Sequence, residues 1–445
     1  MLVRFEVENF LSFRDRVEFS MVAGNSTEHP EHITDVGNDI DDKLLKTGVI
    51  YGANAAGKSN LVKALQFAQS FIVSRPKSDE RINAIPFLLD RTSEDSPSKF
   101  EFEIKCNSGT YIYGFEVDND KVHSEHLAAV CLDEENTIYT RDLDKSGNQE
   151  VKLEDIGRAN EKDNRILNST RDILRSNELF LSKIVDNNIT YLKDVHDWFR
   201  DTLKIVLPDG LSSLITKSYL TAEEFERNAE DMVSLFDLGI DGVELRDFST
   251  DPPADDISEV FRRFGEEQRD VTLLFPSEAM VLFLHGDEHV RAAHVMTMHE
   301  IKSEKLKVVF NLRQESDGTR RLFDLSWAFM SLLSGSADQV LIIDELDLRL
   351  HPHMTTNILD IFLTNSVGKR SQFIATTHEA GLLDLDLLRK DEIWFIEKDG
   401  DGNSTLYSLE EFVPQYDRDI QAGYLQGRFG AIPIVPSYNI LDWAK

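Results

Sequence analysis

The chain has 445 residues, 41% of them hydrophobic, and its 80 acidic and 48 basic residues give a net charge of −32. That length suits one large α/β domain with an insertion, or two domains. So much acid disfavours nonspecific DNA binding, which needs Lys and Arg to neutralise phosphates. It either keeps the protein soluble or attracts a basic partner protein. The sequence has no apolar run of about 18 residues, no apolar leader and two scattered cysteines, so we expect a cytoplasmic protein without membrane spans or disulfides.

The first third of the chain alternates between strand and helix patterns. Apolar–polar alternation predicts strands at 2–8, 99–105, 110–117 and 121–132. A second strand is expected at 16–22, and a short β run at 46–51. A polar loop is expected at 23–44, and an amphipathic helix from Ser59 to Val73. Asn-Ser-Gly and Asp-Asn-Asp turns separate the last three strands, which predicts an antiparallel meander.

Helical patterns dominate the next stretch, from about 155 to 240, with a break at Pro208-Asp209-Gly210 and a loop at 251–256. Beyond it, the pattern predicts strands around 286–312, a helix at 316–334, a buried strand at 339–343, a helix at 354–363, a strand at 372–376 and a hairpin at 392–408. We therefore divide the chain into 1–150, a helical insertion at 151–300, and 301–445.

Residues 52–59 match the P-loop pattern G-x-x-x-x-G-K-[ST] without a mismatch, between a predicted strand and a predicted helix. In such a loop, backbone N–H groups turn inward around phosphates, and the helix N-terminus adds a favourable dipole. Lys58 is predicted to reach the β- and γ-phosphates of ATP, and Ser59 to ligate Mg²⁺. The predicted nucleotide-binding residues are Gly52, Asn54, Ala55, Ala56, Gly57, Lys58, Ser59 and Asn60.

A second motif follows the buried strand at 340–343, where Asp344 and Glu345 come directly after four apolar residues. Asp344 at a strand tip is placed to hold the Mg²⁺ shell, which is the Walker B role. Glu345 then lies where it can polarise the attacking water as a general base. The alternative is an ordinary strand followed by an acidic turn, which the P-loop upstream disfavours.

The third motif, Ser316-Asp317-Gly318-Thr319, is a small-residue turn at the start of a predicted helix. Such a turn is a second design for binding phosphate, and it is equally a plain helix N-cap. A chain with one P-loop does not need a second phosphate-binding turn for its own nucleotide. The functional alternative is that this turn binds the γ-phosphate of a nucleotide held by a neighbouring subunit. The adjacent Arg320 and Arg321 are either trans contacts to phosphate or surface charges.

Histidines give two further candidates. His378 follows the strand at 372–376 and is either a γ-phosphate contact or a sheet-edge residue. His285 and His289, with His294, His299, Asp287 and Glu288 nearby, have a spacing that would place two metal ligands on one helix face. No ligand set with metal spacing follows, so we do not predict a metal site there.

Together these motifs resemble the ABC-type ATPase heads of the SMC, RecF and OLD-like group. More closely, the chain is similar to the small OLD-like ATPases of bacterial phage-defence operons, of the RloA, AbiL and PARIS ATPase kind. The resemblance spans almost the whole chain and rests on Asn9-Phe10-Leu11-Ser12-Phe13, GANAAGKSN, ESDGTRRL, DELDLRLHP, TTHE and GRFGAIP.

The resemblance implies a fold and a set of roles. The fold would be an α/β P-loop ATPase head of the ABC type, with a mixed sheet, an antiparallel β subdomain and a mainly helical insertion. Residues 1–150 would form lobe I and 301–445 lobe II. Ser316, Gly318 and Thr319 would be the signature motif that meets a partner's γ-phosphate, Asp347 would lie in the D-loop, and His378 would be the switch histidine beside the catalytic Glu345.

The chain also departs from these relatives. The family often has a basic residue within the N-terminal stretch, where this chain has Leu11 with Arg14 close behind. A Q-loop glutamine cannot be placed, and residues 155–300 lack the sustained heptads of coiled-coil arms. Only 67 residues follow His378, too few for a Toprim nuclease domain. We therefore expect any nuclease or other effector to be a separate chain.

The expected function is that of an ATP- and Mg²⁺-dependent ATPase subunit of an anti-phage defence complex. It would work as a homodimer, or a higher oligomer, through ATP-bound heads. It would control a separate effector, of Toprim or nuclease type, in response to a phage component. The alternative is a RecF- or SMC-like DNA-repair ATPase, which the net charge disfavours. A scaffold that binds ATP without hydrolysing it is a third reading, and Glu345 argues against it. The sequence leaves nucleic-acid binding open.

Overall fold

The computed structural model describes residues 1–37, 43–74, 76, 80–131, 134–143, 148–154, 161–187, 189, 192–208, 214–216, 221–236, 238–247, 270–275, 279–285, 289–334, 338–412 and 420–432. Parts of several sequence-based predictions lie outside these residues. They include residues 38–42 of the expected loop at 23–44, residues 209–210 of the predicted break, the loop at 251–256, Asp287, Glu288 and Pro433.

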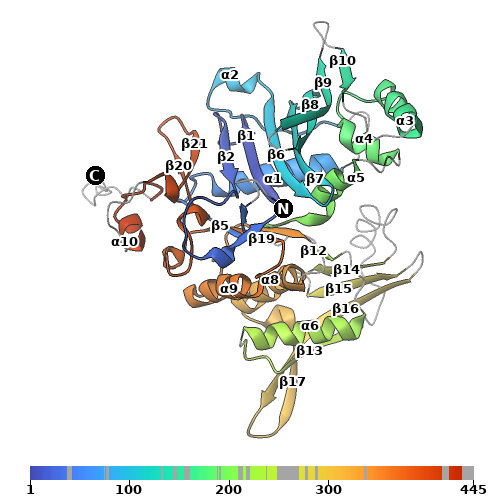
Figure 1. Ribbon diagram of the computed structural model, residues 1–445. Coiled ribbons are helices and arrows are strands. Elements are labelled where there is room, and N and C mark those ends of the chain that lie inside the picture. The colour runs from blue at the N-terminus through green and yellow to red at the C-terminus, as the bar shows by residue number, and fades with distance from the viewer. Residues whose placement is uncertain are drawn as a thin grey trace, which may run out of the picture.

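Seven antiparallel strands form the first sheet, drawn in blue to teal in Figure 1, in the order β10-β9-β8-β7-β6-β1-β2. Their bounds are β1 Leu2–Glu8, β2 Val17–Ser20, β6 Ser98–Cys106, β7 Gly109–Val117, β8 Val122–Cys131, β9 Glu134–Leu143 and β10 Gln149–Leu153. The register aligns Phe5 with Phe102, Phe102 with Tyr113, and Tyr113 with Leu127. All four side chains are buried, so the alternation in sequence becomes one apolar face.

The second sheet is the core of the molecule, with strand order β11-β18-β19-β5-β20-β21. Its strands are β11 Leu203–Val206, β18 Gln339–Ile343, β19 Ser371–Thr377, β5 Thr47–Tyr51, β20 Ile393–Lys398 and β21 Ser404–Ser408. The pairs from β11 to β20 are parallel, and β21 is antiparallel. A mixed sheet with a separate antiparallel sheet confirms the predicted α/β fold class.

Both faces of the core sheet are covered, which is why its strands read as continuous apolar runs. Ile50 packs on the side of α1 (Lys58–Val73) and the seven-stranded sheet. Val49 and Tyr51 pack on the opposite side, with residues of α8 (Asp317–Ser334) and α9 (Pro352–Asn365). In Figure 1, α8 and α9 lie on the side of the core sheet away from the seven-stranded sheet.

Most of the third sheet lies in the stretch expected to be mainly helical, but its last two strands confirm the strands predicted around 286–312. Its strands are β12 Leu214–Thr216, β13 Gly242–Asp247, β14 Asp270–Phe275, β15 Met280–His285, β16 His289–Ile301 and β17 Leu306–Asn311. Helix α6 (Ala222–Leu235) packs against it through a small apolar cluster that includes Phe225 and Phe283. The stretch also supplies β11 to the core sheet, so it is less helical than predicted. The boundaries at 150 and 300 stay predictions.

The remaining helices are α2 Arg91–Glu94, α3 Glu161–Asp172, α4 Phe180–Asp186, α5 Lys193–Asp197, a π-helical turn Trp198–Thr202 and α10 Ile420–Leu425. Short 3-10 turns are η1 Pro30–His32, η5 Leu312–Gln314, η6 Ala380–Leu382, η7 Lys390–Glu392 and η8 Leu409–Glu411. The expected loop at 23–44 contains η1 and a small hairpin of β3 (Ile33–Asp35) and β4 (Lys43–Leu45). None of the described helices is long and apolar enough to cross a membrane.

Candidate nucleotide-binding site

The P-loop connects the end of β5 to the start of α1, as predicted. A Cβ on Gly52 would lie 2.6 Å from the Ile396 carbonyl oxygen of β20, so only glycine fits there. Gly57 has a φ of 122°, and a Cβ there would lie 2.4 Å from Ser404 Oγ. Ala55 also has a positive φ, of 64°. The loop therefore closes into a tight cradle, with Asn54 and Ala55 exposed at its tip and Ala56 buried beneath.

Two serines that the sequence did not single out hold the base of this cradle. Ser404 Oγ donates to the Ala56 carbonyl oxygen at 2.6 Å and lies 2.9 Å from Ser12 Oγ. Asn60 Nδ2 donates to Ser12 Oγ at 2.8 Å. Ser12 belongs to the N-terminal turn used in the resemblance, and Ser404 begins β21. The P-loop is thus fixed from both ends of the chain.

Lys58 points back over the loop and donates to the carbonyl oxygens of Gly52, at 2.7 Å, and Ala53, at 3.2 Å. Its side chain is only 5% exposed, and burial lowers its pKa to about 8, against the attraction of the nearby carboxylates of Asp344, Asp347 and Glu345. The buried ammonium therefore has hydrogen bonds to two carbonyl oxygens in place of those it would make to water. Phosphate oxygens are stronger acceptors than these, so the position suits the role predicted for Lys58.

His378 follows β19 and lies next to Lys58. Its Nδ1 is 3.3 Å from Lys58 Nζ, and burial and the Lys58 charge lower the pKa of the imidazole. Since an ammonium can only donate, Nδ1 accepts, and the hydrogen of the neutral ring is on Nε2. Asp347 accepts from the backbone N–H of His378 at 3.1 Å and from Thr377 Oγ1 at 2.7 Å, which fixes the turn. His378 therefore keeps one N–H for an anion.

Asp344 and Glu345 follow β18, one strand away from His378. Thr376 Oγ1 donates to Asp344 Oδ1 at 2.6 Å and accepts from the Glu345 N–H at 2.8 Å. This hydroxyl orients both residues of the motif, and sequence inspection missed it. Asp344 is 1% exposed, whereas Glu345 is half-buried with a φ of 52°. Among the residues that the structure describes, no donor contacts the Glu345 carboxylate.

Parallel topology brings these groups together. The strands β18, β19 and β5 are neighbours and run in the same direction, so Asp344, His378 and the P-loop all follow carboxyl ends at one edge of the sheet. Ligands of open α/β sheets bind at that edge. Ser59 is half-buried in the first turn of α1, where its hydroxyl and the Asp344 carboxylate supply the oxygen ligands that Mg²⁺ prefers.

The predicted signature residues lie at the start of α8. Ser316 Oγ accepts from the Thr319 N–H at 3.1 Å and is 2.8 Å from Thr319 Oγ1, so Ser316 is the helix N-cap. Ser316 and Asp317 are exposed. A Cβ on Gly318 would lie 2.9 Å from the Arg349 carbonyl oxygen, so the turn packs closely on the segment after Glu345. The alternative that this turn is a helix N-cap is therefore correct. The start of the helix is also exposed, so a partner chain can reach it.

Arg321 is neither a surface charge nor available to a partner. It is 4% exposed, and its Nη2 donates to the carbonyl oxygen of Asp344 at 3.3 Å. Burial lowers the pKa of Arg321 and raises that of Asp324, one helical turn further on, to about 7. Arg321 thus connects α8 to the turn that holds Asp344 and Glu345. Arg320, half-buried, pairs with Asp317.

The idea of two histidine ligands on one helix face is wrong. His285 ends strand β15 and His289 begins β16, and the two residues pair across the hairpin. Their side chains lie outside the described part of the chain. His299 bonds to Glu315 through its Nε2 at 2.7 Å. Pro352 lies in the first turn of α9, where its missing N–H costs no helix hydrogen bond.

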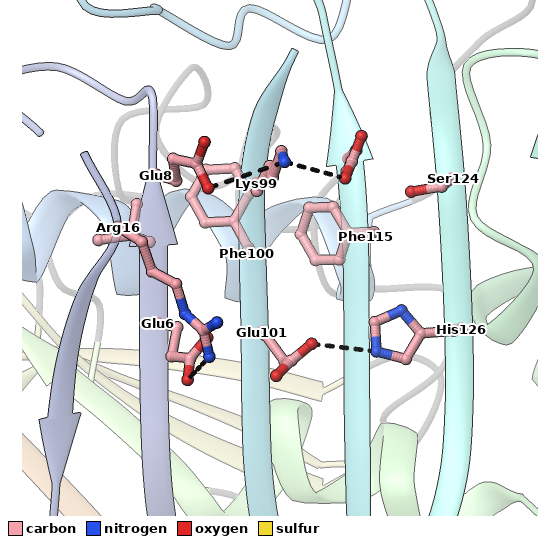
Figure 2. Close-up of a pocket in the computed structure, with 11 residues that line it drawn as sticks. Glu6, Glu8, Arg16, Lys99, Phe100, Glu101, Phe115, Ser124 and His126 are labelled. Carbon is pink, nitrogen blue, oxygen red and sulfur yellow. Dashed lines mark hydrogen bonds and ion pairs between the residues drawn. The ribbon is translucent and has the colours of Figure 1, made fainter. Parts of the chain in front are cut away.

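A pocket of about 180 Å³ lies elsewhere, on the outer face of the seven-stranded sheet (Figure 2). Its basic side chains are paired with acids. Lys99 Nζ is 3.7 Å from Glu8 and 3.5 Å from Glu116, and Arg16 pairs with Glu6. Four glutamates line this pocket, so it does not suit a phosphate, and the candidate nucleotide site remains the P-loop edge of the core sheet.

The sequence profile of a family described as "AAA domain, putative AbiEii toxin, Type IV TA system" matches residues 49–384, from the P-loop strand to beyond His378. The chain belongs to this AAA-domain family. It is an ATPase-type domain, as the four motifs predicted. No curated protein matches the chain.

Among the solved structures similar to this AAA-domain chain are three SMC heads. An SmcHead bound to the C-winged helix domain of ScpA has a TM-score of 0.39 and 16% identity, over 92% of this chain and 97% of the other. The SMC head domain from Thermotoga maritima has a TM-score of 0.38 and 14% identity, over 92% and 98%. A Pyrococcus furiosus Smc head domain with an extended coiled coil, bound to the C-terminal domain of ScpA, has a TM-score of 0.34 and 13% identity, over 96% and 99%.

Proposed function

We propose that this chain is the ATP-binding and ATP-hydrolysing subunit of a bacterial anti-phage defence complex, in which two chains hold ATP between them and control a separate effector. The observation that carries the ATPase part is the grouping of Lys58, Asp344, Glu345 and His378 at one edge of the core sheet. The defence part is supported by the resemblance in sequence and fits a family whose description names a putative toxin.

Each of these residues has a defined task. Lys58 turns its ammonium from the Gly52 carbonyl to the β- and γ-phosphates. His378 offers Nε2–H to a γ-phosphate oxygen, because its Nδ1 is occupied by Lys58. Glu345, held by Thr376 but with a free carboxylate, accepts a proton from the attacking water. Mg²⁺, when held by Ser59 and Asp344, neutralises phosphate charge.

The exposed start of α8 supports the proposed dimer. Ser316 and Thr319 present hydroxyls and a helix N-terminus, which together favour an anion. The cradle for the chain's own nucleotide is already built from β5, α1 and the serines beneath. We therefore infer that the start of α8 binds the nucleotide of a partner chain.

The defence role is tested in bacteria that carry this gene with its genomic neighbour. Wild-type cells are expected to form fewer plaques when challenged with a panel of phages. Glu345→Gln should remove protection, because it deletes the base and keeps the fold. Lys63→Ala, an exposed position on α1, is the matched control and should protect fully. Equal protection by wild type and Glu345→Gln would refute a role for hydrolysis, and no protection by either would refute the defence role.

DNA binding separates this proposal from a repair ATPase. We expect weak binding of duplex DNA that vanishes at moderate salt, because the net charge is −32 and basic residues such as Lys99 and Arg16 are paired with carboxylates. Fluorescence anisotropy with a labelled duplex over a salt series measures this. Tight binding that survives about 200 mM salt would favour the repair alternative.

A further inference from the structure

A cluster of His29, Glu31 and His32 lies far from the P-loop, on the segment between β2 and β3. Each residue offers one atom that could ligate a metal ion, and these three atoms lie within 4.8 Å of one another. Glu31 Oε1 is 3.4 Å from His29 Nδ1 and 3.9 Å from His32 Nε2. The two rings stack with centroids 4.9 Å apart. His32 is buried, His29 is half-buried and Glu31 is exposed, so the cluster opens to solvent on one side.

The outer nitrogen of each ring is already occupied. His29 Nε2 is 2.9 Å from the Leu385 carbonyl oxygen, which can only accept, so this nitrogen carries the hydrogen. His32 Nδ1 lies 3.1 Å from both oxygens of the buried Glu392 carboxylate. In neutral imidazoles with these bonds, His29 Nδ1 and His32 Nε2 are left as lone pairs. Both lie beside the Glu31 carboxylate.

Three acceptors therefore converge without a hydrogen between them. Lone pairs of two imidazoles and a carboxylate at these separations repel one another unless a cation lies among them. With metal–ligand bonds of about 2.0–2.2 Å, neighbouring ligands of a tetrahedral ion are about 3.3–3.6 Å apart. The observed 3.4 Å and 3.9 Å to Glu31 Oε1 are close to this range, and one ligand atom from each residue lies within 4.8 Å of the others, so a bound ion would draw the three groups slightly closer together.

We propose that His29, Glu31 and His32 bind a first-row divalent metal ion, of which Zn²⁺ fits best. Two imidazoles and one carboxylate are a set that Zn²⁺ accepts in tetrahedral geometry with one open position, whereas Mg²⁺ and Ca²⁺ prefer oxygen ligands. The Leu385 carbonyl and the Glu392 carboxylate are the outer partners that metal-bound histidines usually have. The alternative is that both imidazoles are protonated and pair with Glu31 without any metal.

The surroundings hold this geometry without help from the ion. Arg389 donates to the Glu28 carbonyl oxygen, and Gly24 N–H donates to Asp391 Oδ2 at 2.8 Å. The segment 24–32 is therefore fastened to residues 389–391, which lead into β20, the neighbour of the P-loop strand. A bound ion would hold the two imidazoles that join these segments. Its role is structural, because none of its ligands reaches the nucleotide site.

The test uses the full chain without a histidine tag, treated with chelator and kept free of nucleotide. Isothermal titration with Zn²⁺ is expected to show one site per chain, and Zn²⁺ should raise the melting temperature. Glu31→Gln, which removes a ligand at an exposed position, should weaken binding at least tenfold. Glu392→Gln, which alters an outer partner, should weaken it by about 10- to 100-fold. Titration with Co²⁺ should give the visible absorption of a tetrahedral site.

The control is His353→Ala. His351 and His353 also stack, with centroids 5.5 Å apart, but in the described part of the chain they have no carboxylate that completes a cluster. This variant should bind Zn²⁺ as wild type does. Circular dichroism verifies that each variant is folded. No saturable binding, binding unchanged in Glu31→Gln, or equal loss in His353→Ala would overturn the proposal in favour of protonated histidines.

Discussion

Replacing Lys58 by alanine is expected to abolish ATP binding while the fold survives. Lys58 is the ammonium that the structure places over the P-loop, beside the Asp344 and His378 turns. Without it, the β- and γ-phosphates lose a charge-assisted partner that the backbone N–H groups cannot replace. Isothermal titration with a slowly hydrolysed ATP analogue and Mg²⁺ measures the loss. Lys63→Ala, on the exposed face of the same helix, should bind normally.

The fold is expected to survive, because the buried charge of Lys58 lowers the stability of the folded state. Lys58 is only 5% exposed. Burial lowers its pKa from 10.5 to about 8, so the folded state disfavours the charged form. The folded state binds fewer protons than the unfolded state between these two values, so wild-type stability should rise as pH increases from about 8 to 10.5.

Thermal unfolding without nucleotide tests this part of the prediction. Near pH 7, Lys58→Ala should melt no lower than wild type, since it removes a desolvated charge. The variant should also lose the increase in stability above pH 8. Unchanged affinity for the analogue would refute the P-loop assignment. Lost affinity with a collapsed melting temperature would instead indicate that Lys58 is needed for folding.

Local sequence patterns predicted the elements that carry the chemistry. The apolar runs at 46–51, 339–343 and 372–376 became β5, β18 and β19, because a strand buried on both faces leaves a continuous apolar signal. The P-loop, Asp344 and His378 follow these strands, so their motifs could be placed. The strand order that makes them neighbours could not be read, since pairing depends on contacts far apart in the chain.

The residues that sequence reasoning missed act through such distant contacts. Thr376 orients Asp344 across a strand pair, and Ser404 supports the P-loop from a strand about 350 residues further along the chain. Thr376 lies in the TTHE stretch, but the sequence gives its hydroxyl no role there, and nothing in the sequence around Ser404 marks that residue. Arg321 was misread for the same reason, because burial is decided by packing. In the third sheet, β16 and β17 were predicted around 286–312, but β14 and β15 were missed, because a short apolar run does not distinguish a buried strand from part of a helix.

Glu345→Gln is expected to trap ATP-bound dimers. The change removes the proposed base but keeps the shape of the side chain, the Thr376 bond to its backbone and the phosphate contacts of Lys58. ATP should therefore bind and hold two chains together without being cleaved. Size-exclusion chromatography with light scattering should give twice the chain mass with ATP and Mg²⁺, and a lower mass without nucleotide. An unchanged mass would argue against the sandwich.

Mixing two inactive variants tests whether one site needs two chains. Lys58→Ala removes the P-loop half of a site, and Ser316→Arg should remove the signature half by placing a bulky side chain at the exposed start of α8. Each variant alone should be inactive at both sites. A mixed dimer, however, combines an intact Lys58 from one chain with an intact Ser316 from the other, and so regains one working site.

The recovered activity has an upper limit. If half of the dimers are mixed and each has one working site of two, the ATPase rate should reach at most about a quarter of the wild-type value, with the sites treated as independent. The two variants should be co-expressed, so that slow exchange of subunits cannot hide the effect. Ser169→Arg, at an exposed position on α3, controls for the added charge and should stay active alone. A co-expressed mixture that remains inactive, while Ser169→Arg is active, would show that Ser316 does not serve a partner's nucleotide.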